Sequence, residues 1–263
     1  MRFASLALAA SIAAAQTTPA TSPSTAPAPS AQTVPQTEAE KAQAELTRAR
    51  RTLSDWPNLA RYAAENAKVA PAAPDEERVV FMGDSITDAW GRQYPRFFPG
   101  KPYINRGIGG QTTAQMLLRF RPDVIAHKPK AVLILAGTND IAGNTGPYSF
   151  EATKNNLMSM VDLARANNIK VILATVMPVD DYHRNQTTRR PPEKIIELNN
   201  WIKSYAGQNK LTLLDYHSAM VDEKGWMKQE LTTDGLHPHE KGYALIEPLA
   251  QKAIAETLGS AKP

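Results

Sequence analysis

The sequence predicts an α/β protein in three layers, α/β/α, with a parallel sheet covered by helices on both faces. From residue 77 onward, short apolar runs alternate with segments of helical periodicity, which is typical of βα repeats. The runs are apolar throughout, as in strands that are buried on both faces. A separate helical pattern precedes them and predicts an N-terminal helical extension.

Composition limits what the chain can do. Its 263 residues suffice for one sizeable core with length left for tails. The net charge of +4 comes from scattered basic residues, and no long Lys/Arg block suggests a nucleic-acid partner. The absence of cysteine excludes disulfides, thiolate metal sites and a cysteine nucleophile.

Residues 1–15 are predicted to be a signal peptide. Arg2 supplies a basic start, an Ala-rich apolar stretch follows, and small residues precede a cleavage point after Ala15. The apolar run is too short to span a bilayer, and no cysteine is present for lipid attachment. The alternative is an Ala-rich disordered tail. We expect a secreted or periplasmic protein without a stable membrane anchor.

The next segments are a linker and the helical extension. Residues 16–36 are rich in Pro, Ala, Ser and Thr and lack apolar periodicity, which predicts a disordered or semi-extended linker. A capping box at Thr37–Glu40 opens a helical pattern, and a second helical piece is predicted over 57–67. Residues 37–76 are therefore assigned to the extension.

The main domain is predicted over residues 77–258, followed by a tail at 259–263. Its expected strands are Val79–Met82, Tyr103–Asn105, Ala131–Ala136, Lys170–Val176 and Leu211–Leu214. Its clearest helices are expected at 150–168, after the Pro191-Pro192 pair, and at 239–258, where Pro248 should introduce a kink.

Polar motifs follow four of these strands. They read GDSIT from Gly83, NRGIGGQTT from Asn105, GTND from Gly137 and, after a further loop, DGLHP from Asp234. Ligands of open parallel sheets bind beyond the carboxyl ends of the strands. We therefore expect the four motifs to gather at one edge of the sheet.

Ser85 stands where a strand turns into a helix. A serine at such a place is commonly a helix N-cap, and that reading remains an alternative. A helix N-terminus also favours negative charge, so the same position suits a nucleophile whose backbone N–H stabilises an anion.

The glycines at 107, 109 and 110 indicate a close approach of the backbone to a ligand. They do not form a dinucleotide fingerprint, because Thr112 stands where the third glycine is required and the run follows the second strand. A tight loop that donates a backbone N–H is the better interpretation.

The remaining motifs supply a side-chain donor, an acid and a base. Asn139 is either a turn residue or an amide donor to an oxyanion. Asp234 stands three residues before His237, so its carboxylate can accept from Nδ1 and leave Nε2 free to accept a serine proton. His239 is the nearby competitor, without a partner at that spacing. Acyl transfer needs this combination of groups.

Taken together, the four motifs resemble those of the SGNH hydrolases, also called GDSL esterases, over about residues 77–258. The resemblance implies a five-stranded parallel sheet of flavodoxin-like topology and neither metal nor organic cofactor. Its departures are Ile86, which replaces the leucine of the GDSL name, and GTND, where some members have GxNE.

Carried over by position, the resemblance assigns each site residue a role. Ser85 would be the nucleophile, His237 its base and Asp234 the acid that orients the base. The oxyanion hole would consist of the N–H groups of Ser85 and Gly110 and the side chain of Asn139.

The substrate prediction depends on aromatic and polar residues near the site. Trp90, Tyr182 and Arg184 are candidates for the pocket wall, although the loop that carries the latter two is equally compatible with a solvated surface. A polar rim suits a short acyl group on a sugar, so the expected function is hydrolysis of short-chain, preferably acetyl, esters, with a small-molecule or carbohydrate ester as substrate. The alternatives are a lysophospholipase or thioesterase and a non-catalytic carbohydrate- or cell-wall-binding module.

Overall fold

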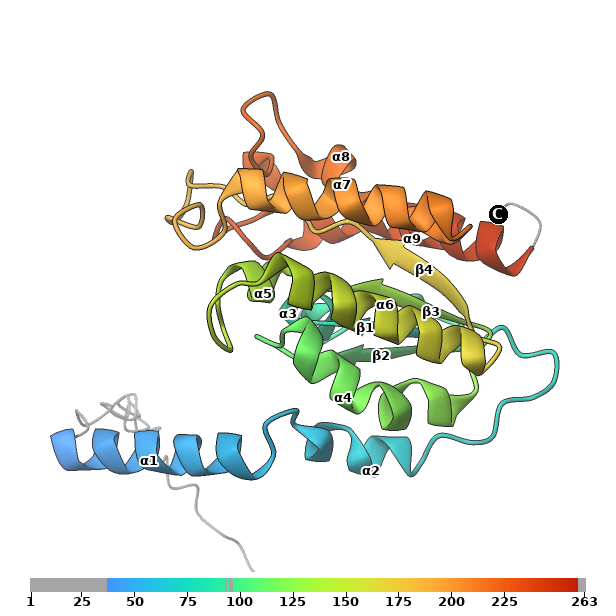
Figure 1. The fold of residues 1–263 in the computed structure, drawn as a ribbon, viewed down its shortest axis with the longest axis horizontal. Helices are drawn as coiled ribbons and strands as arrows, with labels where there is room; N and C mark the ends of the chain where they lie inside the picture. Colours follow the sequence, from blue (N-terminus) through green and yellow to red (C-terminus); the bar gives the residue numbers. More distant parts are fainter. Residues whose placement is uncertain (1–36, 93, 95–96, 260–263) are drawn as a thin grey trace, which may run out of the picture. The chain divides into compact units, whose positions relative to one another are not determined.

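The computed structural model describes residues 37–92, 94 and 97–259. Its five strands form one parallel sheet in the order β2-β1-β3-β4-β5, which is the flavodoxin-like order. The predicted fold class is confirmed (Figure 1). The strands are β1 (Val79–Gly83), β2 (Tyr103–Gly107), β3 (Ala131–Leu135), β4 (Lys170–Ala174) and β5 (Thr212–Leu214).

Every predicted strand is present within two residues of its expected ends. The helices of the α/β part are α3 (Ser85–Ala89), α4 (Thr113–Asp123), α5 (Thr138–Ile141), α6 (Phe150–Ala166), α7 (Pro192–Gln208), α8 (Tyr216–Met220) and α9 (Glu240–Leu258). Short 3₁₀ turns occur at η2 (Ile125–His127) and η3 (Gln229–Leu231). Pro192 occupies the first turn of α7 as predicted, and α9 includes Pro248.

Two apolar cores lie on opposite faces of the sheet. Successive strand residues point to opposite faces, so Val80 and Met82 enter one core and Val79 and Phe81 the other. The first core is closed by residues of α4, α6 and α7, and the second by residues of α3, α8 and α9. Asp84 and Ser85, where β1 passes into α3, belong to neither core.

Trp90 belongs to the second core, so the prediction that it lines the substrate pocket is wrong. Its side chain is 4% exposed and packs with the rings of Phe81, Phe98 and Tyr243. The physical reason is that α3 ends at Ala89, and the next residue turns inward to complete an aromatic cluster.

The chain divides into two units, residues 1–45 and 46–263. The predicted signal peptide and linker lie outside the described residues. In the first unit, α1 (Glu38–Ser54) begins with the predicted capping box: the Thr37 N–H donates to Glu40 Oε2 at 2.8 Å, and the Glu40 N–H donates to Thr37 Oγ1 at 3.2 Å.

The single helical piece predicted at 57–67 is instead two short turns, η1 (Leu59–Arg61) and α2 (Ala63–Asn66). Asn58 interrupts the predicted helix because its backbone is in the left-handed region, with a φ of 55°. Asp55 then caps the new turn, since its carboxylate accepts from the N–H groups of Leu59 and Ala60 at 2.8 and 2.9 Å.

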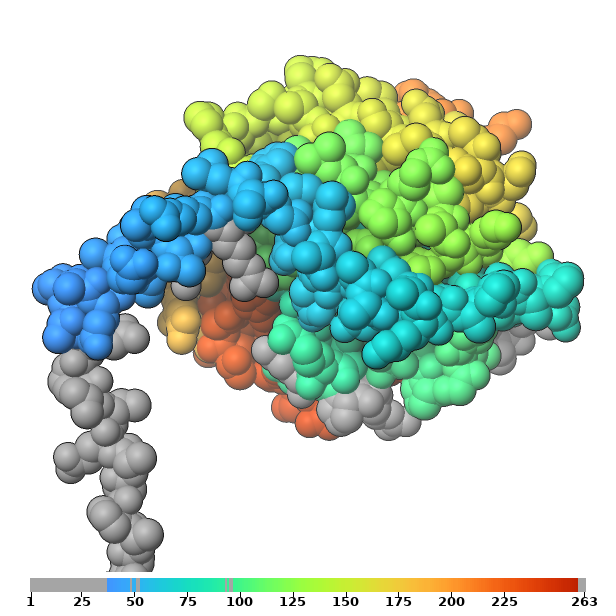
Figure 2. Space-filling view, turned by 90° about the horizontal axis from the view of Figure 1, so that it is seen from below, coloured from blue at the N-terminus to red at the C-terminus, as the bar shows by residue number. Residues whose placement is uncertain are grey.

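Residues 55–76 belong to the second unit and lie against α4, as Figure 2 shows. Asn66 Nδ2 donates to Asp123 Oδ1 at 2.7 Å, and the buried Tyr62 hydroxyl donates to the carbonyl of Gly107 at the end of β2. The segment is therefore tied directly to the edge of the sheet where the polar motifs lie. Within the described part of the chain, no helix combines the length and apolarity needed to cross a bilayer.

Candidate active site

Ser85 is the first residue of α3. It directly follows Asp84, the N-cap residue of α3, which comes after the end of β1. The buried carboxylate of Asp84 accepts from the N–H of Ile86 at 3.0 Å, and its burial raises the pKa of Asp84 to about 6. The half-buried Ser85 hydroxyl lies 2.8 Å from Nε2 of His237. Asp84 rather than Ser85 therefore caps α3, and the Ser85 hydroxyl faces the imidazole of His237.

Asp234 and His237 lie on the loop before α9. Nδ1 of His237 is 2.7 Å from Asp234 Oδ2, while Asp234 Oδ1 accepts from the backbone N–H groups of His237 and Leu236 at 2.8 and 3.0 Å. Partial burial opposes the charge, but these hydrogen bonds outweigh it and lower the pKa of Asp234 to about 2. His239, by contrast, caps α9 by accepting from the Lys241 N–H at 3.0 Å.

This geometry sets the proton positions. An ionised Asp234 accepts the Nδ1 proton of His237, which leaves Nε2 with a lone pair toward Ser85 Oγ. A hydroxyl that donates to a neutral imidazole is the arrangement that activates a serine for attack on a carbonyl carbon.

Asn139 lies in the first turn of α5 and is 3% exposed. Its Oδ1 accepts from Asn144 Nδ2 at 3.0 Å and from Arg190 Nη2 at 3.2 Å, so the orientation of the amide is fixed. One N–H of its Nδ2 donates to the Gln111 carbonyl at 3.0 Å. An amide nitrogen carries two protons, and the second remains available to a ligand.

Gly110 adopts a φ of 78°, which disfavours residues with a side chain. Its carbonyl accepts from Asn144 Nδ2 at 3.0 Å, and among the described residues its N–H has no hydrogen-bond acceptor. A Cβ built on the preceding Gly109 would lie 3.8 Å from Ser85 Cβ, so the glycine loop lies directly beside the serine. Its free N–H is suited to a developing oxyanion.

Several residues that support this site were not predicted. Arg190 is 5% exposed and donates to Thr138 Oγ1 at 3.1 Å and to Gln186 Oε1 at 3.2 Å. Gln186 Nε2 in turn donates to the Asp234 carbonyl at 2.9 Å. Arg190 therefore connects Asn139 with the loop that carries the acid and base. Its sequence context, a basic pair before Pro191, resembles a solvated loop, so no local signal marks it as buried.

Arg119 of α4 is fully buried, and its guanidinium contacts the end of the glycine loop at Gln111. It donates to the carbonyls of Gly83 and Arg106 at 3.0 and 2.8 Å, to Gln111 Oε1 at 2.5 Å and to Asp123 Oδ2 at 2.9 Å. One cation thus holds the ends of β1 and β2 together, which fixes the distance between the serine and the glycine loop.

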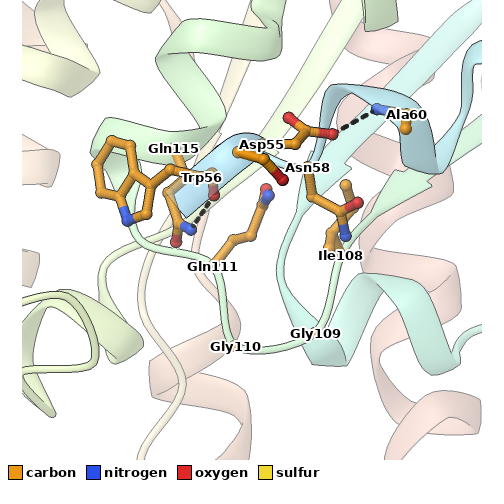
Figure 3. Close-up of a pocket in the computed structure, with 10 residues that line it drawn as sticks. Asp55, Trp56, Asn58, Ala60, Ile108, Gly109, Gly110, Gln111 and Gln115 are labelled. Atoms are coloured by element: carbon orange, nitrogen blue, oxygen red, sulfur yellow. Dashed lines mark hydrogen bonds between the residues drawn. The ribbon is translucent and has the colours of Figure 1, made fainter. Parts of the chain in front are cut away.

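The predicted pocket residues of the loop after β4 lie away from the glycine loop pocket. The Tyr182 hydroxyl donates to Asp222 Oδ2 at 2.8 Å and its ring packs on Trp226, while Arg184 is exposed. A pocket of about 440 Å³ lies instead between the glycine loop and residues 54–60 (Figure 3). Neither Tyr182 nor Arg184 lines it, and its wall residues Trp56 and Asn58 were not predicted.

No group of three or more His, Asp or Glu side chains in the described ranges is arranged to hold a metal ion.

The chain is similar to several known proteins. Residues 81–245 match the GDSL-like lipase/acylhydrolase family. The chain is similar to a GDSL-like lipase of Bacteroides thetaiotaomicron, with 46% identity, a TM-score of 0.71 and coverage of 76% of this chain and 98% of that one.

Two curated enzymes also match. The isoamyl acetate-hydrolyzing esterase of Saccharomyces cerevisiae is 26% identical, with 68% of this chain and 87% of that protein covered. An acetylxylan esterase of Xylanibacter ruminicola is 25% identical, with 69% of this chain but only 44% of that protein covered. The match to another curated relative covers only 32% of the length of that protein.

The family match covers more than half of the chain and includes the strand, the serine turn, the glycine loop and the aspartate–histidine loop that form the site. The chain therefore belongs to the GDSL-like lipase/acylhydrolase family and is a hydrolase of the esterase type.

Proposed function

We propose that this protein is a secreted serine esterase that removes short acyl groups, in the first place acetyl, from carbohydrate or other small ester substrates. The observation that carries this proposal is the continuous contact from Ser85 Oγ to His237 Nε2 at 2.8 Å and from His237 Nδ1 to Asp234 Oδ2 at 2.7 Å. Such a chain of contacts makes a hydroxyl nucleophilic at neutral pH.

The proposed reaction has two steps. Ser85 Oγ attacks the ester carbonyl carbon while His237 Nε2 takes the hydroxyl proton, and the resulting oxyanion is held by the N–H groups of Ser85 and Gly110 and by the Asn139 amide. His237 then gives the proton to the leaving alcohol, which leaves an acyl-serine. Water, deprotonated by the same imidazole, attacks this ester and releases the acid and the free serine.

Two observations support a short acyl group and a polar alcohol. The curated relatives include proteins named for the hydrolysis of isoamyl acetate and acetylxylan. The pocket beside Gly110 is lined by polar as well as apolar residues, which does not suit a long hydrocarbon chain. The signal sequence proposed for residues 1–15 would bring such an enzyme to extracellular polysaccharides and esters.

A chain-length series tests the acyl preference. We expect kcat/KM to be highest for p-nitrophenyl acetate and to fall through the butyrate, octanoate and palmitate esters. A preference for the octanoate or palmitate ester would overturn the acetylesterase proposal and favour a lysophospholipase or thioesterase. Labelling of Ser85 by a fluorophosphonate tests catalysis itself, because a folded but unlabelled protein would favour a non-catalytic binding module.

Asn139→Ala should lower kcat by about 10²–10³, since it removes one preorganised oxyanion donor. KM should change much less, because the donor acts chiefly on the charge that develops in the transition state. Steady-state kinetics with p-nitrophenyl acetate measures both constants. Asn185→Ala, at an exposed position outside this network, is the matched control. A loss of less than threefold in the Asn139 variant would remove it from the oxyanion hole.

The rate should fall at acid pH, because a protonated His237 can no longer accept the serine proton. Asp234 does not account for this fall, because its pKa is lowered to about 2 and the carboxylate stays charged throughout the usual assay range. Asp84 does titrate within that range, with a pKa raised to about 6.

The variant Asp84→Asn separates the two groups, since asparagine still caps α3 but cannot titrate. The acidic limb of the kcat/KM profile should persist in this variant. If the limb disappears, Asp84 rather than His237 controls the pH dependence.

A further inference from the structure

The pocket beside the glycine loop joins two parts of the chain that are distant in sequence. One wall is formed by Asp55, Trp56 and Asn58 and the other by Ile108, Gly110 and Gln111 (Figure 3). Its volume of about 440 Å³ is within the range of small-molecule sites. All of its lining residues belong to the unit that contains the sheet.

The pocket lies next to the site of reaction, because both include the glycine loop. Gly110, whose N–H has no acceptor within the described ranges, forms part of its wall, and a Cβ on Gly109 would lie 3.8 Å from Ser85 Cβ. The segment that carries Trp56 and Asn58 also contacts the helix of the nucleophile, since Arg61 Nη2 is 3.6 Å from Oδ1 of Asp88 in α3. A molecule in the pocket is thus adjacent to an ester bound at the serine.

The lining combines one aromatic ring with polar groups. Trp56 is 36% exposed, so the indole is accessible to a ligand. The half-buried Asn58 amide has no hydrogen-bond partner among the described residues, which leaves both donors and the acceptor to a ligand. Apolar C–H surface beside hydroxyl groups is the complement of such a lining. A sugar ring has that chemistry, and an acyl chain does not.

The wall is held by backbone contacts rather than by these two side chains. Gln111 Nε2 donates to the Pro57 carbonyl and Gln115 Nε2 to the Trp56 carbonyl, each at 2.7 Å. The bond to the Trp56 carbonyl and the cap from Asp55 to Ala60 are drawn as dashed lines in Figure 3. The side chains of Trp56 and Asn58 are therefore free to act on a ligand, and their replacement leaves the anchoring bonds in place.

We propose that this pocket binds a sugar ring on the alcohol side of the scissile ester, with Trp56 stacking on the ring and Asn58 bonding to its hydroxyl groups. The proposal rests on the proposed function and extends it: the segment that precedes the α/β domain supplies part of the substrate site. Carbohydrate specificity then depends on residues outside the span that matches the family.

The test is a ratio of two specificity constants, kcat/KM for an acetylated xylo-oligosaccharide divided by that for p-nitrophenyl acetate. Trp56→Ala should lower this ratio about tenfold, which corresponds to the loss of an aromatic contact of about 1.4 kcal/mol. Trp56→Phe should retain most of it. Asn58→Gly should lower the ratio as well, and glycine suits this variant because position 58 has a φ of 55°.

Leu118→Ala is the control, since Leu118 is an exposed apolar residue of α4 that does not line the pocket. Its ratio should equal that of the wild type. Unchanged ratios in both Trp56→Ala and Asn58→Gly, with a wild type that hydrolyses the acetylated saccharide, would overturn the pocket proposal and leave the proposed function intact.

Binding of the deacetylated xylo-oligosaccharide to Ser85→Ala, measured by calorimetry, tests the pocket without turnover. Binding to Ser85→Ala that is lost in the double variant Ser85→Ala/Trp56→Ala supports the pocket proposal. If the wild type nevertheless does not hydrolyse the acetylated form, the proposal of a carbohydrate esterase fails and the pocket proposal stands. Absence of both binding and carbohydrate turnover would overturn the pocket and that part of the proposed function together.

Discussion

Ser85→Ala should reduce ester hydrolysis by at least about 10⁴-fold, because no other group replaces the attacking oxygen. Among the described residues the hydroxyl has one hydrogen-bond contact, to His237 Nε2 at 2.8 Å, and Asp84 rather than Ser85 caps the helix. The melting temperature should therefore remain near that of the wild type. Hydrolysis of p-nitrophenyl acetate and thermal unfolding measure the two effects.

Ser204→Ala provides the matched control, because Ser204 is an exposed serine of α7 remote from the catalytic loops in the sequence. It should retain full activity. If Ser85→Ala kept more than about one hundredth of the wild-type rate, the covalent mechanism would have to be abandoned, since loss of a serine nucleophile costs far more.

Asp234→Asn is expected to lower kcat by about 10⁴-fold, because it alters the imidazole tautomer. The wild-type carboxylate accepts from Nδ1 of His237, whereas an amide NH₂ at the same position donates to Nδ1 and moves the proton to Nε2. Nε2 then carries a hydrogen and cannot accept one from Ser85. The amide oxygen can still accept from the N–H groups of Leu236 and His237, so the loop should remain folded.

The measurement is kcat for p-nitrophenyl acetate together with the melting temperature. Asp162→Asn, at an exposed position of α6, changes the net charge by the same amount and should leave both kcat and the melting temperature unchanged. A folded Asp234→Asn enzyme with activity within tenfold of the wild type would show that the carboxylate does not set the tautomer.

Much of the architecture was predictable because it depends on short-range patterns. The five strands were found from continuous apolar runs, and the parallel sheet followed from their alternation with helices. The position of the serine turn also follows locally, since β1 ends at Gly83 and α3 begins two residues later. The roles of Ser85, Asp234 and His237 remain predictions for the variants above.

Burial of individual side chains was not predictable in this way. Trp90 was predicted to line the substrate pocket, yet it packs with Phe81 and Phe98, which are near in sequence, and with Tyr243 of α9, which is distant. Which side of a turn an aromatic residue joins depends on such a distant partner, which its sequence neighbourhood does not show.

The sequence by itself determined the order of strands and helices and the chemical groups at the strand ends, because periodicity and motif spacing are local properties of the chain. The tertiary structure alone decided that Arg190 and Asn144 hold the amide of Asn139 and that residues 54–60 form a wall beside Gly110. These contacts join residues that are 5 to 54 positions apart. They are brought together by side-chain packing and by the pairing of buried polar groups, and no short sequence pattern encodes either.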